Sequence, residues 1–388
     1  MKLPRSILVF VGFGLAAMAG SAWAKDHAIA IGQDWPAPAA VSPGDRILLE
    51  PGLHPPRELR AYRGTREAPI EITARTTEVP TGIGSSDAGG WSLRLLDCDH
   101  LVVRSLLVMC AGAGGIEIEG PEGERGGTVG LVDLQLLPAD PTAPSEEGVV
   151  ARGLDRATFV GVRVRRWISN AVRIENTRLA DVRLLVNDGS PEKSTCRTGL
   201  RVVGTDRVGL DSCSFIGLTE SGLDLRTEGS EKASSVQIAR CVFLNTGTPV
   251  MIRPGVGTRV DASLVANTFV EPQRLIAVEE IPDPEDSGRR PRVKATMDRG
   301  LVTWTVGGLQ EIALAAPNIL ELTLGRNLWA SIEADLFFGG GVPFTDDQSA
   351  EQLIEVEVSL DPRTLLPRSS PALGFGHGFR PDNPNGPE

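Results

Sequence analysis

A short strand-like motif that recurs every 23 to 33 residues is the feature that most constrains how this chain folds. In each copy a small residue, or in two copies Pro or Leu, precedes apolar residues at alternate positions, which is the pattern of a half-buried β-strand. The seven copies begin at Gly115, Gly148, Ala171, Gly199, Gly222, Pro249 and Leu275. One such repeat cannot bury its own apolar face, so the series predicts a stack of coils that share one core.

A second motif lies between these copies and has the pattern apolar, two residues, apolar, one residue, apolar. Its members are Leu131, Leu134 and Leu136; Phe159, Val162 and Val164; Leu210, Cys213 and Phe215; Ile238, Cys241 and Phe243; and Leu264, Asn267 and Phe269. No helical pattern or leucine-rich consensus separates the motifs, and a propeller blade would need about 40 residues. The sequence therefore predicts an all-β fold, a single-stranded right-handed parallel β-helix.

The ends of the chain predict its domain organisation. Lys2 and Arg5 precede a short apolar run that ends in Ala22-Trp23-Ala24, so residues 1–24 form a predicted signal peptide with cleavage near Ala24. We expect a secreted or periplasmic protein without a transmembrane segment, because no stretch has about 18 uninterrupted apolar residues. Residues 25–388 form the predicted β-helix domain, with an N-terminal cap at about 25–45 and an irregular C-terminal cover at about 360–388.

Two further features complete the expected fold. The segment 281–315 breaks the period and is rich in proline and charge at its start, which predicts a hairpin that projects from the solenoid.

Cys213, Cys241 and Asn267 occupy equivalent positions and should form an inward ladder, because equivalent residues of successive coils lie about 4.8 Å apart. Both buried thiols and a Cys213–Cys241 disulfide agree with that spacing.

The charge of the chain excludes one class of partner. Removal of Lys2 and Arg5 leaves 37 basic and 50 acidic residues, a net charge of −13. Nucleic-acid binding needs a basic surface, so we expect no nucleic-acid partner. A local basic stripe can still bind an anionic sugar on an acidic protein.

Three segments carry a resemblance to a known superfamily. Residues 43–49 read Pro-Gly-Asp-Arg-Ile-Leu-Leu, residues 63–65 read Arg-Gly-Thr before an Ala-Pro-Ile at 68–70, and residues 370–372 read Ser-Pro-Ala. These motifs resemble the opening, turn and closing motifs of secreted right-handed β-helix proteins of the pectate-lyase-like superfamily. The resemblance covers nearly the whole mature chain and implies the same fold, which hosts lyases, hydrolases, epimerases and binding proteins.

A narrower resemblance concerns residues 247–255, which read Gly-Thr-Pro-Val-Met-Ile-Arg-Pro-Gly, followed by Asn267-Thr268-Phe269. This arrangement is similar to that of the chondroitinase-B and alginate-lyase family of polysaccharide lyases. The resemblance implies that Arg253 is a catalytic arginine, that Lys232 is the catalytic lysine one coil earlier, and that Asp224 is a calcium ligand, with Ca²⁺ as the cofactor.

The outward positions of the first motif supply the binding residues. They form two columns, Glu117, Val150, Arg173, Arg201, Asp224, Met251 and Ala277, and Glu119, Arg152, Glu175, Val203, Arg226, Arg253 and Glu279. A coil repeat of about 4.8 Å is close to the length of one sugar unit. Because guanidinium groups bind carboxylates bidentately, Arg152, Arg173, Arg201 and Arg226 are predicted to bind an acidic, uronate-containing polysaccharide. The same side chains would equally form cross-strand ion pairs on a solvated face.

Three functions remain open at this point. The leading hypothesis is a secreted β-helix protein that binds acidic polysaccharide and cleaves it as a divergent lyase by β-elimination, with Lys232 as the base. The rival is a non-catalytic surface or interaction protein, which is favoured by Arg226 at the place of a second calcium acid and by Lys232 in a loop. The third is a glycoside hydrolase, which would need two facing carboxylates about 5 to 10 Å apart.

Overall fold

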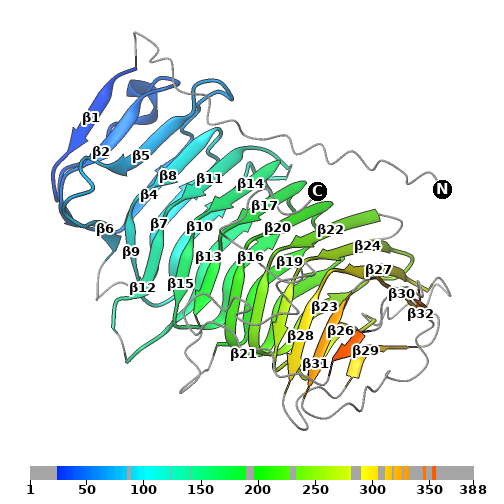
Figure 1. The fold of residues 1–388 in the computed structure, drawn as a ribbon. Helices are drawn as coiled ribbons and strands as arrows, with labels where there is room; N and C mark the ends of the chain where they lie inside the picture. Colours follow the sequence, from blue (N-terminus) through cyan, green and yellow to red (C-terminus); the bar gives the residue numbers. More distant parts are fainter. Residues whose placement is uncertain are drawn as a thin grey trace.

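The chain winds into coils, and most coils contribute one strand to each of three parallel rows. The computed structural model describes residues 24–84, 89–123, 125–140, 142–188, 196–227, 233–280, 290–304, 311–316, 319–325, 327–331, 344–346 and 352–354. Every pairing between neighbouring coils is parallel, as in β11 with β8 and β14. Figure 1 shows the strand labels in three oblique series that run from the N-terminal to the C-terminal coils. The right-handed parallel β-helix predicted from the sequence is confirmed.

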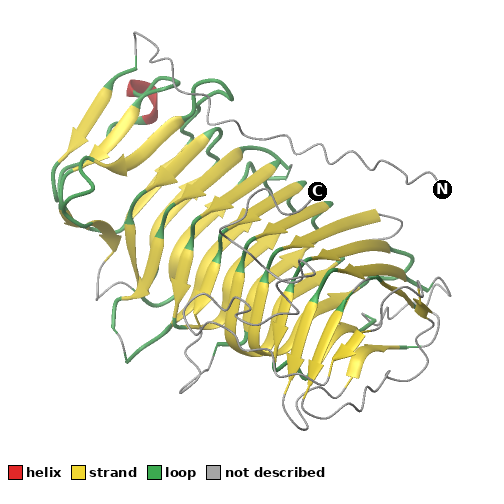
Figure 2. Cartoon of the chain, in the orientation of Figure 1, coloured by secondary structure: helices red, strands yellow, loops and turns green. Residues whose placement is uncertain are grey.

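The first row of strands forms one continuous sheet. It consists of β1 (Asp26–Ile29), β2 (Arg46–Leu49), β5 (Ile70–Ala74), β8 (Leu101–Arg104), β11 (Thr128–Val132), β14 (Arg156–Val160), β17 (Leu179–Arg183), β20 (Arg207–Asp211), β22 (Ala233–Ala239), β24 (Arg259–Val265), β27 (Arg292–Asp298), β30 (Leu320–Leu324) and β32 (Phe344–Asp346). A short 3-10 helix, η1 (Pro38–Ala40), lies between β1 and β2 and is the one helix drawn in Figure 2.

The second and third rows are joined by two long strands, β21 (Ser214–Arg226) and β23 (Val242–Arg253), which run through the corner between them. The second row otherwise consists of β3 (Gly52–His54), β6 (Thr81–Gly84), β9 (Leu107–Cys110), β12 (Gln135–Pro138), β15 (Arg163–Arg165), β18 (Val186–Asp188), β25 (Thr268–Val270), β28 (Leu301–Trp304), β31 (Leu328–Ser331) and β33 (Gln352–Ile354). The third consists of β4 (Arg57–Arg60), β7 (Trp91–Leu96), β10 (Gly114–Glu119), β13 (Ser145–Arg152), β16 (Trp167–Glu175), β19 (Thr198–Val203), β26 (Arg274–Val278) and β29 (Glu311–Ala315).

A left-handed residue makes the bend between the first and second rows. The bend residues share a φ between 51° and 67° and are Ser105, Asp133, Gly161, Leu184, Ser212, Arg240, Ala266 and Arg299. This bend explains the second sequence motif, because its first residue lies near the end of a first-row strand, its second directly precedes the second-row strand, and its third lies in that strand. A coil therefore has three strands where the sequence indicated two motifs.

The core is a set of ladders that run along the solenoid. Phe215, Phe243 and Phe269 stack with ring centroids 4.9 and 5.2 Å apart. Cys213 and Cys241 are buried as free thiols, and Asn267 Nδ2 donates to the Ile238 carbonyl while its Oδ1 accepts from the Cys241 amide. The predicted inward ladder of these residues is confirmed.

The predicted hairpin near 281–315 is wrong where that segment is described. β27 pairs in parallel with both β24 and β30, and β28 and β29 pair in parallel with β25 and β26. These strands are an ordinary coil of the solenoid. The break in period comes from a long connection between β26 and β27, and residues 281–289 of it lie outside the described part. A coil tolerates such an insertion because the entropic cost of closing a loop grows only slowly with loop length.

At the N-terminal end of the solenoid, several hydrogen bonds converge on the carboxylate of one residue, Asp45. Asp45 accepts the backbone N–H groups of Lys25 and Ser42 and contacts His27 Nε2 at 3.1 Å. Burial works to raise the pKa of Asp45, but the hydrogen bonds from Ser42 and Lys25, together with His27, outweigh it and lower that pKa. These contacts link Lys25, His27 and Ser42 to Asp45 within the predicted cap at 25–45.

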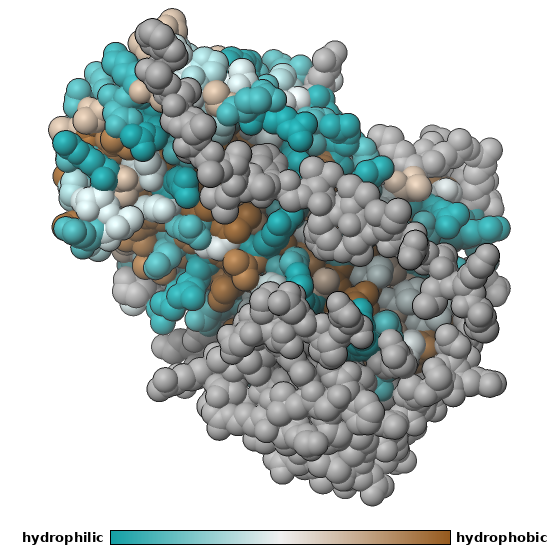
Figure 3. All heavy atoms as spheres, turned by 45° about the horizontal axis from the view of Figure 1, so that its top comes forward, coloured by the Kyte–Doolittle hydropathy of each residue, from teal (hydrophilic) through white to brown (hydrophobic). Residues whose placement is uncertain are grey.

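Figure 3 shows the hydropathy of the residues on one face of the molecule. Hydrophilic residues cover much of the N-terminal coils, and hydrophobic residues appear between them in smaller groups (Figure 3). None of the helices in the described ranges is long and apolar enough to cross a membrane. The signal peptide at 1–24 and the cover at 360–388 fall outside the described residues, apart from Ala24, and both stay predictions.

Candidate functional site

The candidate site lies on the outer face of the third row. The strand register aligns Arg173 with Arg201, Arg201 with Asp224, and Arg226 with Arg253, as the two predicted columns require. The residues of these columns alternate with inward core residues such as Leu223 and Leu225, because successive side chains of a strand point to opposite faces.

Three arginines from successive coils converge on Asp224, the centre of what we call the arginine cluster (Arg201, Asp224, Arg226 and Arg253). Asp224 Oδ2 accepts from Arg201 Nε at 2.9 Å and from Arg226 Nη2 at 3.1 Å. Asp224 Oδ1 accepts from Arg253 Nη1 at 2.5 Å. The Asp224 side chain is 1% exposed, whereas the three arginine side chains are 20 to 34% exposed. The carboxylate is thus a buried anchor that fixes three partly exposed guanidinium groups.

Arg253 has a second carboxylate partner. Its Nε donates to Glu279 Oε2 at 3.0 Å. Burial works to lower the pKa of Arg253, but the charges of Asp224 and Glu279 outweigh it and raise the pKa above its ordinary value. The guanidinium therefore stays charged at any physiological pH.

Arg152 belongs to a different network on the neighbouring coils. Its Nε donates to Glu175 at 2.9 Å, and its Nη1 donates to Glu117 at 3.3 Å and to Glu119 at 3.2 Å. Arg94 Nε reaches Glu117 from the other side at 2.6 Å. These contacts are the cross-strand ion pairs that the sequence left as an alternative, and they place Arg152 against three glutamates.

Glu147 is a buried carboxyl group at the start of the same face, and the sequence reasoning missed it. Its Oε1 accepts from Asn170 Nδ2 at 2.9 Å and lies 3.6 Å from Arg173 Nη1. Its Oε2 is buried and has no hydrogen-bond partner. Burial raises the pKa of Glu147, and Asn170 and Arg173 only partly oppose that rise. The signal for it was weak, since Glu147 precedes the Gly148 motif and belongs to neither column.

The predicted site residues therefore divide into two groups. One group is the arginine cluster, in which Arg201, Arg226 and Arg253 surround Asp224. The other group is Arg152 and Arg173, which lie on the two preceding coils beside glutamates. Lys232, the predicted base, lies outside the described residues, so its role stays a prediction. Within the described ranges no group of three or more His, Cys, Asp or Glu side chains is arranged to hold a metal ion. Both oxygens of Asp224 accept hydrogen bonds from arginines, and its role as a calcium ligand stays a prediction.

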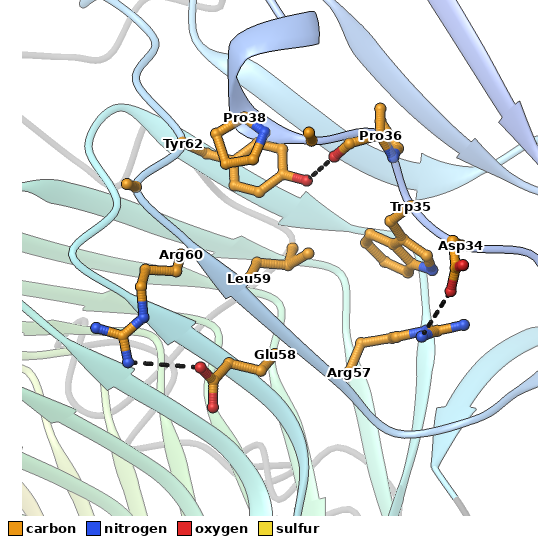
Figure 4. Close-up of a pocket in the computed structure, with 11 residues that line it drawn as sticks. Asp34, Trp35, Pro36, Pro38, Arg57, Glu58, Leu59, Arg60 and Tyr62 are labelled. Atoms are coloured by element: carbon orange, nitrogen blue, oxygen red, sulfur yellow. Dashed lines mark hydrogen bonds and ion pairs between the residues drawn. The ribbon is translucent and has the colours of Figure 1, made fainter.

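A separate hollow of about 590 Å³ opens at the N-terminal end of the third row (Figure 4). Trp35, Arg57, Glu58, Arg60 and Tyr62 line it. The Tyr62 hydroxyl donates to the Pro36 carbonyl, and Arg60 lies 3.5 Å from Glu58. The hollow adjoins the outer face because Glu58 also pairs with Arg94 at 2.7 Å.

The architecture defines the class of protein first: a right-handed parallel β-helix, as the sequence motifs predicted. No family model and no curated protein matches the sequence. The chain is similar to solved structures of other proteins at low sequence identity, and the fold assignment itself rests on the strand order and register above.

Among these structures is a mutant of the family 6 alginate lyase AlyGC, with 13% identity over 92% of this chain and a TM-score of 0.40. The chain spans 57% of the length of that enzyme. A mannuronic-acid-specific family 6 lyase from human gut microbiota has 14% identity over 81% of this chain and 83% of its own, with a TM-score of 0.43. The pectate lyase Pel9A has 12% identity over 90% of this chain and 89% of its own, with a TM-score of 0.39.

Proposed function

We propose that this protein binds an acidic, uronate-containing polysaccharide at the arginine cluster. The observation that supports the proposal is the convergence of Arg201, Arg226 and Arg253 on the single buried carboxylate of Asp224. Three guanidinium groups against Asp224 and the Glu279 partner of Arg253 leave a charge excess of +1 on three successive coils. A polyanion gains from that excess, and a neutral polymer does not.

The cluster also presents hydrogen-bond donors in a suitable geometry. Each of the three arginines keeps at least one terminal nitrogen that makes no hydrogen bond to the described residues, because Asp224 uses only one or two nitrogens of each. Asp224 and its neighbours hold the guanidinium groups in place, so less side-chain entropy is lost on binding. The repeat of about 4.8 Å between strands matches one sugar unit per coil.

β-elimination is the finer form of the proposal. The Arg253 guanidinium would neutralise a uronate carboxylate and so stabilise the carbanion formed when a base removes the α-proton. The electron pair would then form the carbon–carbon double bond as the glycosidic oxygen leaves and takes up a proton. The described residues of the arginine cluster include no Lys, His or Tyr to act as the base, so this step depends on Lys232. Binding is therefore the primary proposal.

The test is calorimetric titration of the mature protein with oligomers of mannuronate, guluronate and galacturonate. We expect Arg226→Gln combined with Arg253→Gln to weaken binding at least tenfold, since a hydrogen bond to a charged group contributes about 1.5–3 kcal/mol. Arg259→Gln is the matched control, because Arg259 is 63% exposed on the first row and pairs with Asp261. Equal affinity in the cluster variant and the control would overturn the proposal.

The same samples test cleavage. A lyase produces an unsaturated uronate whose ultraviolet absorbance rises with time, with or without Ca²⁺. A rise that Lys232→Ala and Arg253→Ala both abolish would support β-elimination. Binding without any rise would leave a non-catalytic carbohydrate-binding protein, and an increase in reducing ends without the absorbance would instead indicate hydrolysis.

A further inference from the structure

The outer face of the third row is divided into an acidic section and a basic section. The acidic section lies on β10, β13 and β16, which carry five glutamates and two arginines, a net charge of −3. Its members are Glu117, Glu119, Glu146, Glu147, Glu175, Arg152 and Arg173. The basic section is the arginine cluster on β19, β21 and β23, whose four residues carry a net charge of +2, or +1 when the Glu279 partner of Arg253 is included.

Both arginines of the acidic section lie against glutamates and are poorly placed to bind a carboxylate of a ligand. Arg152 already contacts three glutamates. Arg173 lies between two, with its Nη1 3.6 Å from Glu147 and its Nε 3.4 Å from Glu175. Each guanidinium is therefore surrounded by carboxylates, and a uronate placed here would meet more negative than positive charge.

The boundary between the sections is sharp. Arg173 and Arg201 are paired residues of neighbouring strands, so Glu175 on β16 lies one coil from Arg201 on β19, and Glu147 on β13 lies two coils from it. One coil is about 4.8 Å, which is less than the screening length of about 8 Å at physiological ionic strength. The Glu175 carboxylate therefore repels a polyanion at the next position along the face, and Glu147, which also interacts with the charge of Arg201, adds to that repulsion.

The basic section also ends on its other side. The strand after β23 carries Ala277 in the first column, and Glu279 follows it in the second, where it pairs with Arg253. The cluster thus spans three strands, or about 10 Å, between two acidic limits. Three consecutive uronate units fit that length.

We infer that the basic section binds a segment of about three uronate units. Glu147 and Glu175 set this limit, because their carboxylates repel the part of a longer polyanion that would extend from β19 toward β16. The inference rests on the proposed function, because it specifies what length of acidic chain the arginine cluster accepts. Glu147 and Glu175 act here as specificity-determining residues that a correctly placed short ligand does not touch.

The experiment is a calorimetric length series with oligouronates of one to eight units. We expect the affinity of the wild-type protein to rise up to about three units and to change less than twofold from four to eight. An affinity that keeps rising to six or eight units would overturn the inference and leave the proposed function intact. Failure of every length to bind would remove the proposed function itself, so the two failures are distinguishable.

A variant pair tests the role of the two glutamates. Glu147→Gln combined with Glu175→Gln should improve binding of the hexamer about tenfold and leave trimer binding within twofold. Asp261→Asn with Glu321→Gln on the first row is the control, because it makes the same change in net charge away from the face. Equal gains for hexamer and trimer, or the same gain in the control, would overturn the assignment. If the variant does not fold, as judged by circular dichroism, the wild-type length series still decides.

Discussion

At the scale of the residue, Asp224 is the side chain on which the arginine cluster depends. Its carboxylate is almost fully buried, yet three guanidinium groups from three coils satisfy its two oxygens. A buried charge is tolerated only when it is paired and hydrogen-bonded in this way. The positions of all three arginines are thereby coupled through one residue.

Replacing Asp224 should therefore cost considerable stability. We expect Asp224→Asn to lower the free energy of unfolding by about 3 kcal/mol, because it removes the carboxylate that Arg201 and Arg226 share and leaves Arg253 with Glu279 alone. Guanidinium-chloride unfolding measures the change. Asp261→Asn, which breaks the exposed pair with Arg259, should cost less than about 1 kcal/mol. A loss at Asp224 no larger than at Asp261 would contradict the anchoring role.

Glu147 predicts a pH dependence of stability. Burial raises its pKa in the folded state above that of the unfolded chain, so the folded state binds the proton more tightly. Its contribution is favourable at low pH and is lost as the pH rises above the unfolded value of about 4.3 toward the raised folded value. Glu147→Gln should therefore gain stability relative to the wild type as the pH increases. Thermal unfolding from pH 4 to about pH 8 would show the gap widening; a constant gap would be inconsistent with the raised pKa.

At the scale of the element, the bend between the first and second rows determines where each coil turns. The bend needs a left-handed backbone, which costs a non-glycine residue roughly 1–2 kcal/mol. Leu184 adopts it with φ of 53° although its side chain is exposed, and Gly161 adopts it with φ of 67°. The coil imposes this conformation whatever residue occupies the position.

This bend gives a pair of opposed predictions. Leu184→Asn should stabilise the protein by about 0.5–1 kcal/mol, because asparagine tolerates the left-handed region better than leucine. Gly161→Ala should destabilise it, because the added Cβ would lie 2.4 Å from Asp133 Oδ1 and the φ is positive. Thermal melting of both variants provides the comparison. The same sign of effect for both would contradict the strain argument.

At the scale of the whole molecule, strand pairing joins each coil to its neighbours, and the core is continuous because its ladders are in register. A longer contact also exists, because Arg125 bonds to Asp206 three coils further along. The Phe215, Phe243 and Phe269 stack and the Cys213, Cys241 and Asn267 ladder are two such columns. Stability in such a solenoid is approximately a sum over coils and the interfaces between them.

Deletion of one complete coil tests this view. Residues 154–176 span one period, because Gly153 and Asn176 both have a left-handed backbone at equivalent turns and Arg156 pairs with Leu179. We expect the shortened chain to keep its β-sheet circular dichroism and cooperative unfolding, with a lower denaturant slope. Deletion of half that segment should abolish folding, because it places apolar residues on the outer face. Loss of structure in both would contradict a modular solenoid.

The sequence by itself determined the fold class, the coil period, the inward ladder and the two outward columns. A period-two pattern fixes which face each residue occupies, and the repeat fixes which residues align, so Arg201, Asp224 and Arg253 could be placed on one face without coordinates. The interruption at 281–315 misled the same reasoning, since an insertion at a turn changes the period without changing the pairing of the strands.

Only the tertiary structure decided how these side chains interact. Asp224 lies in one column and Arg226 and Arg253 lie in the other, and their contact depends on side-chain direction and burial, which sequence spacing does not specify. The burial of Glu147 and the occupation of Arg152 by three glutamates were likewise invisible in the pattern. Charge balance on a folded face arises from neighbours about 5 Å apart in space and more than 20 residues apart in the chain, and that is why it appears only once the coils are stacked.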